Sequence, residues 1–433
     1  MSTPYEVFLA SKQRRCGELG HYIAPDAAHP GLHPWQAEIV AWAVRKGRAA
    51  LWEDTGLGKT RQQIEWARLS GNTALIVAPL AVSAQTVREA AHVDVDARYI
   101  RSGDQLTGPG VWVTNYEMAD RFNPNQLDAV VLDEASILKA HDGKTRTKLI
   151  KHFAGVPRRL SCTATPAPND PEELTNQAEF LGVCSRVDML ATYFIHDDEG
   201  WRLKGHATAP MYEWMASWAF ALRRPSDMGY PDDGYQLPGL EIIPQLLPVN
   251  INVEGQLFPT DLGGVGGRAR IRRETLDARC GRAVDLVNNE PDEPWLLWCG
   301  LNDEAELLTR SIPGAVNVHG SMRPEEKTEA LLAFTDGDIR TLVTKPSVAG
   351  FGMNWQHCAR MAFVGLSDSF EAYYQCIRRC YRYGQRRVVR AHVVLSELES
   401  QIADNITRKE REANRTINGL VTAMQRTRQE TAA

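Results

Sequence analysis

Short runs of hydrophobic residues alternate with amphipathic segments along most of this chain. The runs at 73–79 and 129–132 are typical of parallel strands that are buried on both faces. Between the runs, segments such as 34–45 place their apolar residues on one helical face. The repeated order of strand, helix and strand predicts a doubly wound α/β sheet.

This order occurs twice along the chain, and two such series predict two α/β domains with parallel sheets. A pair of like domains is typical of proteins that bind a ligand between them. The first series has strand patterns at 49–52, 73–79, 97–100, 111–114, 129–133 and 158–165, and helix patterns at 34–45, 60–69 and 82–90. The second series has strand patterns at 294–299, 315–318, 340–344 and 391–395, and helix patterns at 282–289, 303–310 and 324–334.

The region between the two series has a different pattern. Helix patterns at 172–181 and 211–222 are separated by prolines and polar residues, and the glycine-rich segment 262–267 follows. We therefore expect a partly helical connector, and one long polar helix without a sustained heptad at the end of the chain. The expected parts are an edge segment (1–32), a first domain (33–180), a connector with a helical insertion (181–280), a second domain (281–396) and a C-terminal helix (397–433).

Composition limits the class of protein. The chain has 433 residues, of which 43% are hydrophobic and 24% are charged, as in globular proteins of two or three domains. It contains no apolar run long enough to span a membrane, and residues 1–10 lack the pattern of a secretory signal. We therefore expect a cytoplasmic protein with no membrane partner. The eight cysteines have no CxxC spacing, which argues against a zinc ribbon and a disulfide framework.

The formal net charge of −5 is unevenly distributed along the chain. Residues 372–433 contain twelve Lys and Arg residues against six Asp and Glu residues. A local excess of positive charge favours contact with the phosphates of a nucleic acid, whatever the sign of the total charge.

The first chemical landmark is a glycine-bearing loop between the strand pattern at 49–52 and the helix pattern at 60–69. Its glycines allow successive backbone N–H groups to converge on an anion, and the following helix adds the positive end of its dipole. Lys59 would reach the terminal phosphates of a nucleotide, and the Thr60 hydroxyl would ligate Mg²⁺. An ordinary glycine turn is the alternative interpretation. The loop residues are Thr55, Gly56, Leu57 and Gly58.

Two adjacent carboxylates end the fifth strand pattern and form the second landmark. Open α/β sheets bind ligands at the carboxyl ends of their strands. Asp133 would hold Mg²⁺, directly or through water, and Glu134 would accept a proton from the water that attacks the γ-phosphate. A solvated turn is the alternative, and the preceding phosphate loop favours the functional interpretation. Thr163 and Thr165, which end the next strand, can bond to this pair, although capping the strand exit is the simpler role.

The third landmark is a basic segment late in the second series. Gln375, Arg379 and Arg382 are spaced at i, i+4 and i+7, so a helix would place all three on one face. Arginines on such a face can neutralise charge on a transferring phosphoryl group. A solvated basic face is the alternative when this segment is considered alone.

Together these blocks resemble the superfamily 2 helicases and translocases, most closely their SWI/SNF-type branch, which includes compact forms of bacteria and phages. Residues 54–60 match motif I of that branch, so Glu53, which stands where the strict phosphate-loop pattern has glycine, is no departure. Ser136 replaces the histidine or aspartate that is common at the end of motif II. The remaining blocks follow in the family's order: 33–36 looks like the adenine-recognising glutamine block, and 78–80, 132–136, 162–166, 344–356 and 375–385 look like motifs Ia, II, III, V and VI.

The resemblance implies two RecA-like domains with ATP and Mg²⁺ between them and a nucleic-acid backbone lying across both. It implies adenine recognition by Gln36 and backbone contacts near Thr114, Thr344 and Gly350. Further nucleotide contacts are implied in the second domain, at Gly352, Asn354 and Gln375.

The resemblance also implies a cycle of closure and release. ATP held by Lys59, Thr60 and Asp133 would recruit Arg379 and Arg382 from the other domain, and hydrolysis would remove that bridge. The catalytic residues on this account are Lys59, Asp133, Glu134, Arg379 and Arg382.

Three functions stay open at this point. The first is an ATP-dependent DNA translocase or helicase. The second is an RNA-directed helicase, which is less favoured because the sequence shows no element that reads a 2′-hydroxyl. The third is a scaffold that senses ATP with negligible turnover, and such a scaffold would need neither Glu134 nor the two arginines.

Overall fold

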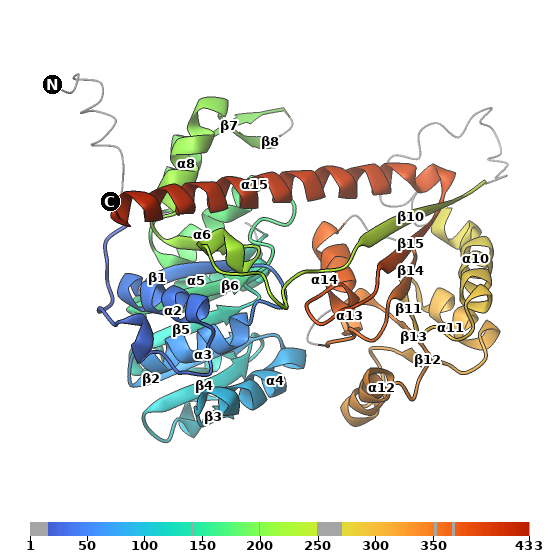
Figure 1. The fold of residues 1–433 in the computed structure, drawn as a ribbon, viewed down its shortest axis with the longest axis horizontal. Helices are drawn as coiled ribbons and strands as arrows, with labels where there is room; N and C mark the ends of the chain where they lie inside the picture. The colour runs from blue at the N-terminus through green and yellow to red at the C-terminus, as the bar shows by residue number, and fades with distance from the viewer. Residues whose placement is uncertain are drawn as a thin grey trace. The chain divides into compact units, whose positions relative to one another are not determined.

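A computed structural model describes residues 16–140, 143–198, 200–248, 271–349, 353–365 and 369–432. The chain divides into two compact units. Unit 1 comprises Met1–Asp233 and Arg411–Ala433, and unit 2 comprises Gly234–Glu410. Each unit contains one parallel sheet with helices packed against it (Figure 1).

Unit 1 is built on a seven-stranded sheet in which all neighbouring strands run parallel. The strand order is β3-β4-β2-β5-β6-β1-β9, so β1 becomes a neighbour of β6 although more than a hundred residues separate them. Parallel neighbours need crossover connections, which the helices supply. The strands are β1 (Arg48–Glu53), β2 (Thr73–Ala78), β3 (Ala97–Tyr99), β4 (Gly110–Asn115), β5 (Ala129–Asp133), β6 (Arg158–Thr163) and β9 (Ala219–Leu222).

The three helices predicted for the first series, α2, α3 and α4, are present, and α5 is a further helix, not predicted from the sequence. Pro34 opens the first of them, α2, because a proline at the first helical position loses no needed N–H bond. Gly47, with a φ of 70°, ends α2 in a conformation that glycine adopts readily. In Figure 1, α2, α3 and α4 lie in front of the unit-1 sheet. The helices are α2 (Pro34–Lys46), α3 (Lys59–Leu69), α4 (Leu80–Ala90), α5 (Lys144–His152) and α6 (Leu174–Leu181).

The prediction of a single helix over 211–222 is wrong. Helix α8 ends at Met215, and strand β9 follows and pairs with β1. All four residues of β9 are buried. A short apolar run fits a helix or a strand equally well by periodicity. Here the run forms a strand because its backbone can pair with that of β1. The other elements of this region are α7 (Arg186–Tyr193), the antiparallel hairpin β7 (Phe194–Asp197) and β8 (Gly200–Leu203), and α8 (Thr208–Met215).

Unit 2 contains a six-stranded parallel sheet with the order β10-β15-β14-β11-β13-β12. The predicted strands of the second series are present. Two further strands join them, β10 at one edge of the sheet and β14 between β15 and β11. The strands are β10 (Leu240–Leu247), β11 (Trp295–Cys299), β12 (Ala315–Val318), β13 (Thr341–Thr344), β14 (Arg360–Val364) and β15 (Val389–Ser396).

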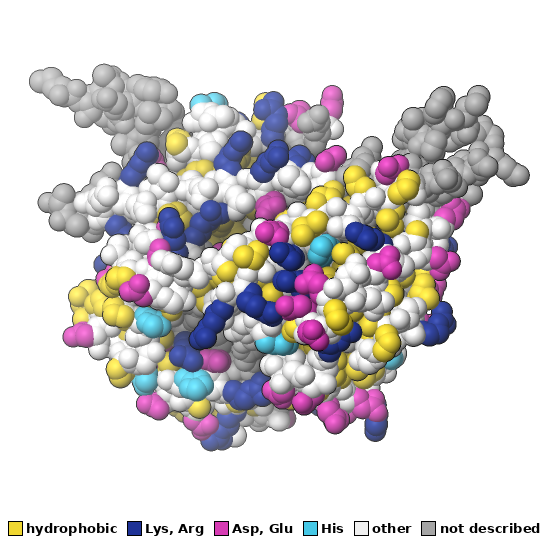
Figure 2. Space-filling view, turned by 45° about the vertical axis from the view of Figure 1, so that its right-hand side comes forward, with side chains coloured by type: hydrophobic (Ala, Val, Ile, Leu, Met, Phe, Trp, Pro, Cys, Tyr) yellow, Lys and Arg dark blue, Asp and Glu magenta, His cyan; other side chains and the backbone are white. Residues whose placement is uncertain are grey.

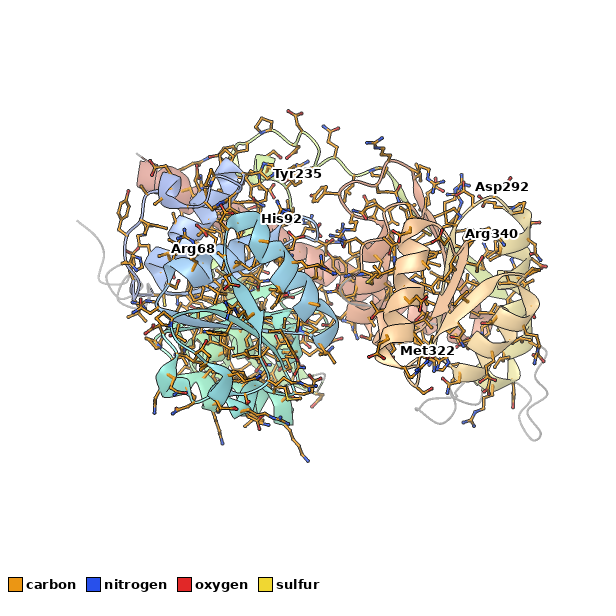
Figure 3. All side chains as sticks on the ribbon, turned by 90° about the horizontal axis from the view of Figure 1, so that it is seen from below. Arg68, His92, Tyr235, Asp292, Met322 and Arg340 are labelled. Carbon is orange, nitrogen blue, oxygen red and sulfur yellow. The ribbon has the colours of Figure 1, made fainter. Side chains whose placement is uncertain are left out.

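Figure 3 shows the polarity of the unit-2 sheet. Asp292 and Arg340, which precede β11 and β13, lie toward one edge, and Met322, which follows β12, lies toward the opposite edge. Loops that follow the strands, including the one that leads from β13, therefore gather at the carboxyl edge, where α/β sheets bind ligands.

Helices α10 and α11 cover one face of this sheet, and the helix predicted from residue 282 already begins at Leu276. Their apolar residues pack with those of the central strands in one core cluster that includes Val287, Leu308, Trp295 and Leu297. The unit-2 helices are α10 (Leu276–Asn289), α11 (Asn302–Ser311), α12 (Pro324–Asp336), α13 (Pro346–Ala349) and α14 (Phe370–Cys380).

A buried ion pair ties α10 to the carboxyl edge of the unit-2 sheet. Arg279 Nη1 donates to Glu304 Oε1 at 2.6 Å, and both side chains are 0% exposed. Arg279 also donates to the backbone oxygens of Val364 and Arg272, and Glu304 Oε2 accepts from the N–H of Gly300 at 2.8 Å. This network satisfies both charges inside the unit.

Replacement of one member of this ion pair should lower the free energy of unfolding more than replacement of both members does. Arg279→Met leaves the Glu304 carboxylate buried without its cation, so we expect the free energy of unfolding to fall by about 3–5 kcal/mol. The double variant Arg279→Met with Glu304→Gln should recover most of that loss. Urea denaturation followed by tryptophan fluorescence tests this, and equal losses in both variants would contradict it.

The predicted C-terminal helix is present as α15 (Ser400–Ala432). Its residues up to Glu410 belong to unit 2, and its residues from Arg411 onward belong to unit 1. None of the helices in the described ranges combines the length and apolar character that crossing a membrane requires.

Candidate nucleotide site

The phosphate loop lies between β1 and α3, as predicted. Gly56 and Gly58 have φ values of 88° and 80°, which are left-handed conformations that favour glycine. Gly58 directly precedes α3, so the loop leads into a helix N-terminus whose free N–H groups and positive dipole end suit a phosphate. Leu57 is buried between the two glycines.

Gln36 of α2 contacts this loop. Its Nε2 donates to Leu57 O at 2.8 Å, and its Oε1 accepts from His33 N at 2.9 Å. A Cβ added at Gly58 would lie 2.4 Å from Gln36 Nε2. The glutamine that the sequence associates with adenine therefore also holds the phosphate loop, and the close packing explains why glycine stands at position 58.

Lys59 and Thr60 begin α3 at the end of the loop. Lys59 Nζ donates to the backbone oxygens of Glu53 at 2.6 Å and of Asp54 at 3.0 Å. Thr55 N is hydrogen-bonded to Asp54 Oδ1 at 2.7 Å, and the Thr55 hydroxyl is buried without a hydrogen-bond partner among the described residues. The lysine is thus held at the loop. The nearby Thr55 hydroxyl is free to form a hydrogen bond with a nucleotide.

Asp133 and Glu134 lie at the end of β5, and the sheet order β5-β6-β1 places this end close to the phosphate loop. Glu134 has a φ of 57° and a ψ of 55°, an uncommon conformation for a residue other than glycine. Its Oε1 accepts hydrogen bonds from Thr163 Oγ1 at 2.6 Å and from Ser136 Oγ at 3.0 Å. The bond expected of Thr163 is therefore present.

Thr165 behaves differently from Thr163. Its backbone N–H donates to Thr163 Oγ1 at 3.0 Å, but its own hydroxyl is buried without a hydrogen-bond partner among the described residues. Of the two roles that the sequence leaves open for Thr165, a side-chain bond to the carboxylate pair is therefore not observed. The end of β6 turns at this position, so Thr165 supports Thr163 and does not reach Glu134.

Burial shifts the acidity of two carboxyl groups at this site. Burial raises the pKa of Asp133 to about 6, and the charge of Glu134 adds to the effect. Burial also raises the pKa of Glu53 to about 7, while Lys59 and a hydrogen bond from Gln62 act in the opposite direction. Carboxylates that are costly to ionise gain from a nearby cation. The residues therefore fit Mg²⁺ held by Asp133 and Thr60 beside a nucleotide.

Two further residues belong to the site although the sequence assigned them no role. Tyr116 OH donates to Asp133 O at 2.6 Å, and burial, reinforced by the charge of Asp133, keeps its pKa well above the usual value. Glu53 is fully buried at the end of β1. A signal for Tyr116 existed, because a hydroxyl that directly follows a buried strand must lie at the same sheet edge as Asp133.

In unit 2, Arg379 and Arg382 converge on the segment Met353–Asn354. Arg379 Nη1 donates to Met353 O at 3.1 Å, and Arg382 Nη1 donates to Asn354 Oδ1. Gln375 Oε1 accepts from Arg379 Nη2 at 3.0 Å. Burial, with Arg379 and Arg378 nearby, lowers the pKa of Arg382 to about 9. The arginine still carries its charge at neutral pH.

The prediction that one helical face carries Gln375, Arg379 and Arg382 is wrong. Helix α14 ends at Cys380, so Arg382 lies in the following turn. What brings the two arginines together is the segment that both bind, and not the i, i+4, i+7 spacing.

Several other expected contact residues are buried or lie outside the described part of the chain. Thr114 and Thr344 are fully buried in β4 and β13, and the Thr344 hydroxyl donates to Val318 O at 2.8 Å. Neither side chain is exposed for a nucleic-acid contact. Gly350 and Gly352 lie outside the described residues.

A phosphate loop and a strand-end carboxylate pair in one α/β unit, followed along the chain by a second α/β unit, are typical of P-loop nucleotide-binding proteins. Two family models match the chain. The SNF2-related domain matches residues 30–189, and the helicase conserved C-terminal domain matches residues 279–384. Together they span more than half the chain, which therefore belongs to the SWI/SNF-type branch of the superfamily 2 helicases and has its tandem RecA-like architecture.

The curated relatives are similar at low identity. The DNA annealing helicase and endonuclease ZRANB3 of Mus musculus is 22% identical over 93% of this chain and 42% of its own length. The same protein of Bos taurus is 26% identical over 36% of this chain and 16% of its own length. This chain therefore spans less than half the length of either relative.

One solved structure of similar extent is the Sulfolobus solfataricus SWI2/SNF2 ATPase core in complex with dsDNA. It shares 17% sequence identity with this chain, and the alignment covers 94% of this chain and 96% of that chain with a TM-score of 0.44. At that TM-score the likeness supports no statement about this chain.

Glu53 generates a stability prediction. Because its pKa is about 7 in the folded protein and near 4.5 when exposed, the folded state binds an extra proton between these values, and stability falls as pH rises through that window. Glu53→Gln removes the penalty. We expect the nucleotide-free variant to be more stable than the wild type by about 1–3 kcal/mol at pH 8.5, with the gain vanishing near pH 4.5.

Glu65→Gln is the matched control, because Glu65 is equally buried but pairs with Arg68 at 2.6 Å. This variant should lose stability at pH 8.5. Chemical denaturation at pH 5 and pH 8.5 distinguishes the two, and a Glu53→Gln variant that is no more stable than the wild type at pH 8.5 would overturn the interpretation of Glu53.

Proposed function

We propose that this protein is an ATP-dependent DNA translocase or helicase that couples hydrolysis to movement along a nucleic-acid backbone. The observation that carries the proposal is the grouping of Lys59, Asp133 and Glu134 at the carboxyl ends of β1 and β5, which both pair with β6, and the two hydroxyls that hold Glu134. A protein that only senses ATP has no need of an oriented general base.

Each residue of unit 1 has a role in this proposal. Lys59 and the N–H groups of the loop bind the terminal phosphates, and Asp133 and Thr60 hold Mg²⁺. Bound Mg²⁺ would supply positive charge to the phosphate oxygens. Glu134 accepts the proton of the attacking water, and Thr163 and Ser136 fix the carboxylate orientation for that transfer.

The arginines of unit 2 have the role of stabilising charge on the transferring phosphoryl group. Support comes from their chemistry, because Arg382 is charged and half-buried and its Nε has no hydrogen-bond partner among the described residues. Gln375 and Asn354 position Arg379 and Arg382 respectively. A γ-phosphate that engages these arginines in one nucleotide state only would supply the differential affinity that drives a conformational cycle.

DNA is the nucleic acid along which we propose that the protein moves. The relatives of mouse and cattle carry the name of a DNA annealing helicase, and this chain matches the SNF2-related domain over residues 30–189. An RNA-directed helicase is the second candidate, and an ATP-sensing scaffold with negligible turnover is the third. Contacts to phosphates should depend weakly on sequence and strongly on salt.

Steady-state ATP hydrolysis separates these candidates. We expect turnover to rise with single-stranded or duplex DNA, and Lys59→Ala and Glu134→Gln to lower the DNA-stimulated kcat by about 100-fold or more. Glu213→Gln serves as the control because it removes an exposed carboxylate of α8 to which the proposal gives no role, and it should leave the stimulated kcat unchanged. Turnover that no nucleic acid changes would refute the motor, and stimulation by RNA alone would favour the second candidate.

Gln36 should affect nucleotide binding more than chemistry. Gln36→Ala removes the bonds to Leu57 O and His33 N, so we expect the KM for ATP to rise about tenfold, equivalent to a loss of about 1.4 kcal/mol. The kcat at saturating ATP should stay within about threefold. Parallel measurements with GTP report adenine recognition, and an unchanged KM for ATP would exclude the role of Gln36 in the site.

A further inference from the structure

The part of α15 that belongs to unit 1 is firmly docked along one side. Thr416, Leu420 and Met424 are buried, at 5%, 1% and 3% exposure. Arg428 Nη2 donates to Glu38 Oε2 at 2.8 Å, and Gln425 Nε2 donates to Asp227 O at 2.9 Å. The docked side fixes which residues of the helix face the solvent.

Gly419 shows how closely the helix approaches unit 1. A Cβ added at this position would lie 2.3 Å from Cε2 of Tyr212, and the Tyr212 hydroxyl is hydrogen-bonded to Thr416. Helix α15 is therefore held against α8 without room to rotate about its axis. Its opposite face stays exposed to solvent.

That opposite face carries a regular row of basic and neutral polar side chains. The row follows the helical spacing i, i+4, i+7, i+11 and i+15, which places its members on one side of a helix. It contains no acidic residue, whereas Glu412 lies outside it. The members are Arg411, Arg415, Asn418, Thr422 and Arg426, all of which are exposed.

The three arginines of this row differ from exposed arginines that a carboxylate neutralises. Arg98, Arg202 and Arg323, for example, each pair with a carboxylate. Arg411, Arg415 and Arg426 have neither a hydrogen bond nor an ion pair with any other described residue. In a protein with a net charge of −5, a row of unneutralised guanidinium groups is a candidate surface for an anionic partner.

The geometry of the row suits an extended anion and not a small one. From Arg411 to Arg426 the helix rises by about 22 Å, which is roughly two-thirds of one turn of duplex DNA. Figure 2 shows dark blue side chains recurring along the band where Figure 1 draws α15. Guanidinium groups bind phosphates in a bidentate manner, and amide and hydroxyl side chains between them can add hydrogen bonds.

We propose that Arg411, Arg415 and Arg426 form a binding surface for the sugar–phosphate backbone of duplex DNA, separate from the residues that hydrolyse ATP. The inference rests on the proposed function, because it assumes that the protein moves along DNA. It assigns α15 the task of raising affinity for DNA without reading sequence and without taking part in chemistry.

The test is DNA binding measured by fluorescence anisotropy with a labelled 30-base-pair duplex over a range of KCl concentrations. For the triple variant Arg411→Ala, Arg415→Ala, Arg426→Ala, we expect affinity to fall about tenfold or more at 100 mM KCl. Its plot of log affinity against log salt should be shallower by up to about 0.9 for each lost phosphate contact. The kcat for ATP at saturating DNA should equal that of the wild type, while the DNA concentration for half-maximal stimulation rises.

Two controls make the outcome decisive. Replacement of three other exposed arginines, Arg98, Arg101 and Arg310, by alanine removes the same charge and should leave affinity within about twofold of the wild type. A triple lysine variant at 411, 415 and 426 keeps the charge and should retain most of the affinity.

The outcomes of this test are separable. An alanine variant that binds DNA as well as the control variant overturns the inference, as does a lysine variant that loses as much affinity as the alanine variant. Wild-type protein that binds no DNA at all overturns the proposed function instead.

Discussion

Negative charge buried at the carboxyl edge of the unit-1 sheet is the constraint on which the rest of the site depends. Glu53 ends β1, Asp133 ends β5, and the pairing of both strands with β6 brings these carboxyl groups to one edge. Burial raises the pKa of Asp133 to about 6 and that of Glu53 to about 7, so ionising them is costly without a cation. Lys59 supplies one positive charge, and a divalent ion beside it would offset the remainder. The same buried carboxylates therefore lower the stability of the ligand-free protein and raise its affinity for a cation.

Unit 2 contributes positive charge, which two arginines carry near the segment Met353–Asn354. Backbone and side-chain oxygens of Met353, Asn354 and Gln375 accept hydrogen bonds from the guanidinium groups of Arg379 and Arg382. Compare Arg279, whose charge Glu304 neutralises completely in the same unit. Arg382 Nε has no hydrogen-bond partner among the described residues, so this guanidinium group could donate a further bond to a phosphate.

Much of the fold could be predicted from the sequence because both sheets are parallel and buried, and such strands appear as continuous apolar runs. The loop at Gly56 and Gly58 could be predicted for a similar reason, since left-handed backbone conformations leave few alternatives to glycine. Strand β9 could not, because a run of four apolar residues has no period, and only the neighbouring strand determines its structure. The end of α14 at Cys380 was also missed. No proline or glycine breaks that helix before Gly384, and tertiary bonds to Met353 and Asn354 decide where it stops.

Side-chain partnerships were the least predictable part of the site. The sequence indicates that Thr163 can reach Glu134, but the same reasoning applied to Thr165 fails because the backbone turns between them. Tyr116 donates to the backbone oxygen of Asp133, and Ser136 donates to the carboxylate of Glu134, so these two donors reach the site from different elements. Such contacts depend on which strands become neighbours, and that order is a property of the whole sheet.

The central claim is that unit 1 binds the nucleotide while the unit-2 arginines respond to its γ-phosphate. Calorimetric titration of the wild type and of Arg382→Ala with ADP and with a slowly hydrolysed ATP analogue, both with Mg²⁺, tests this claim most directly. The account predicts that Arg382→Ala lowers affinity for the ATP analogue about tenfold and leaves affinity for ADP within about twofold. An equal loss for both nucleotides, or no loss for either, would contradict it.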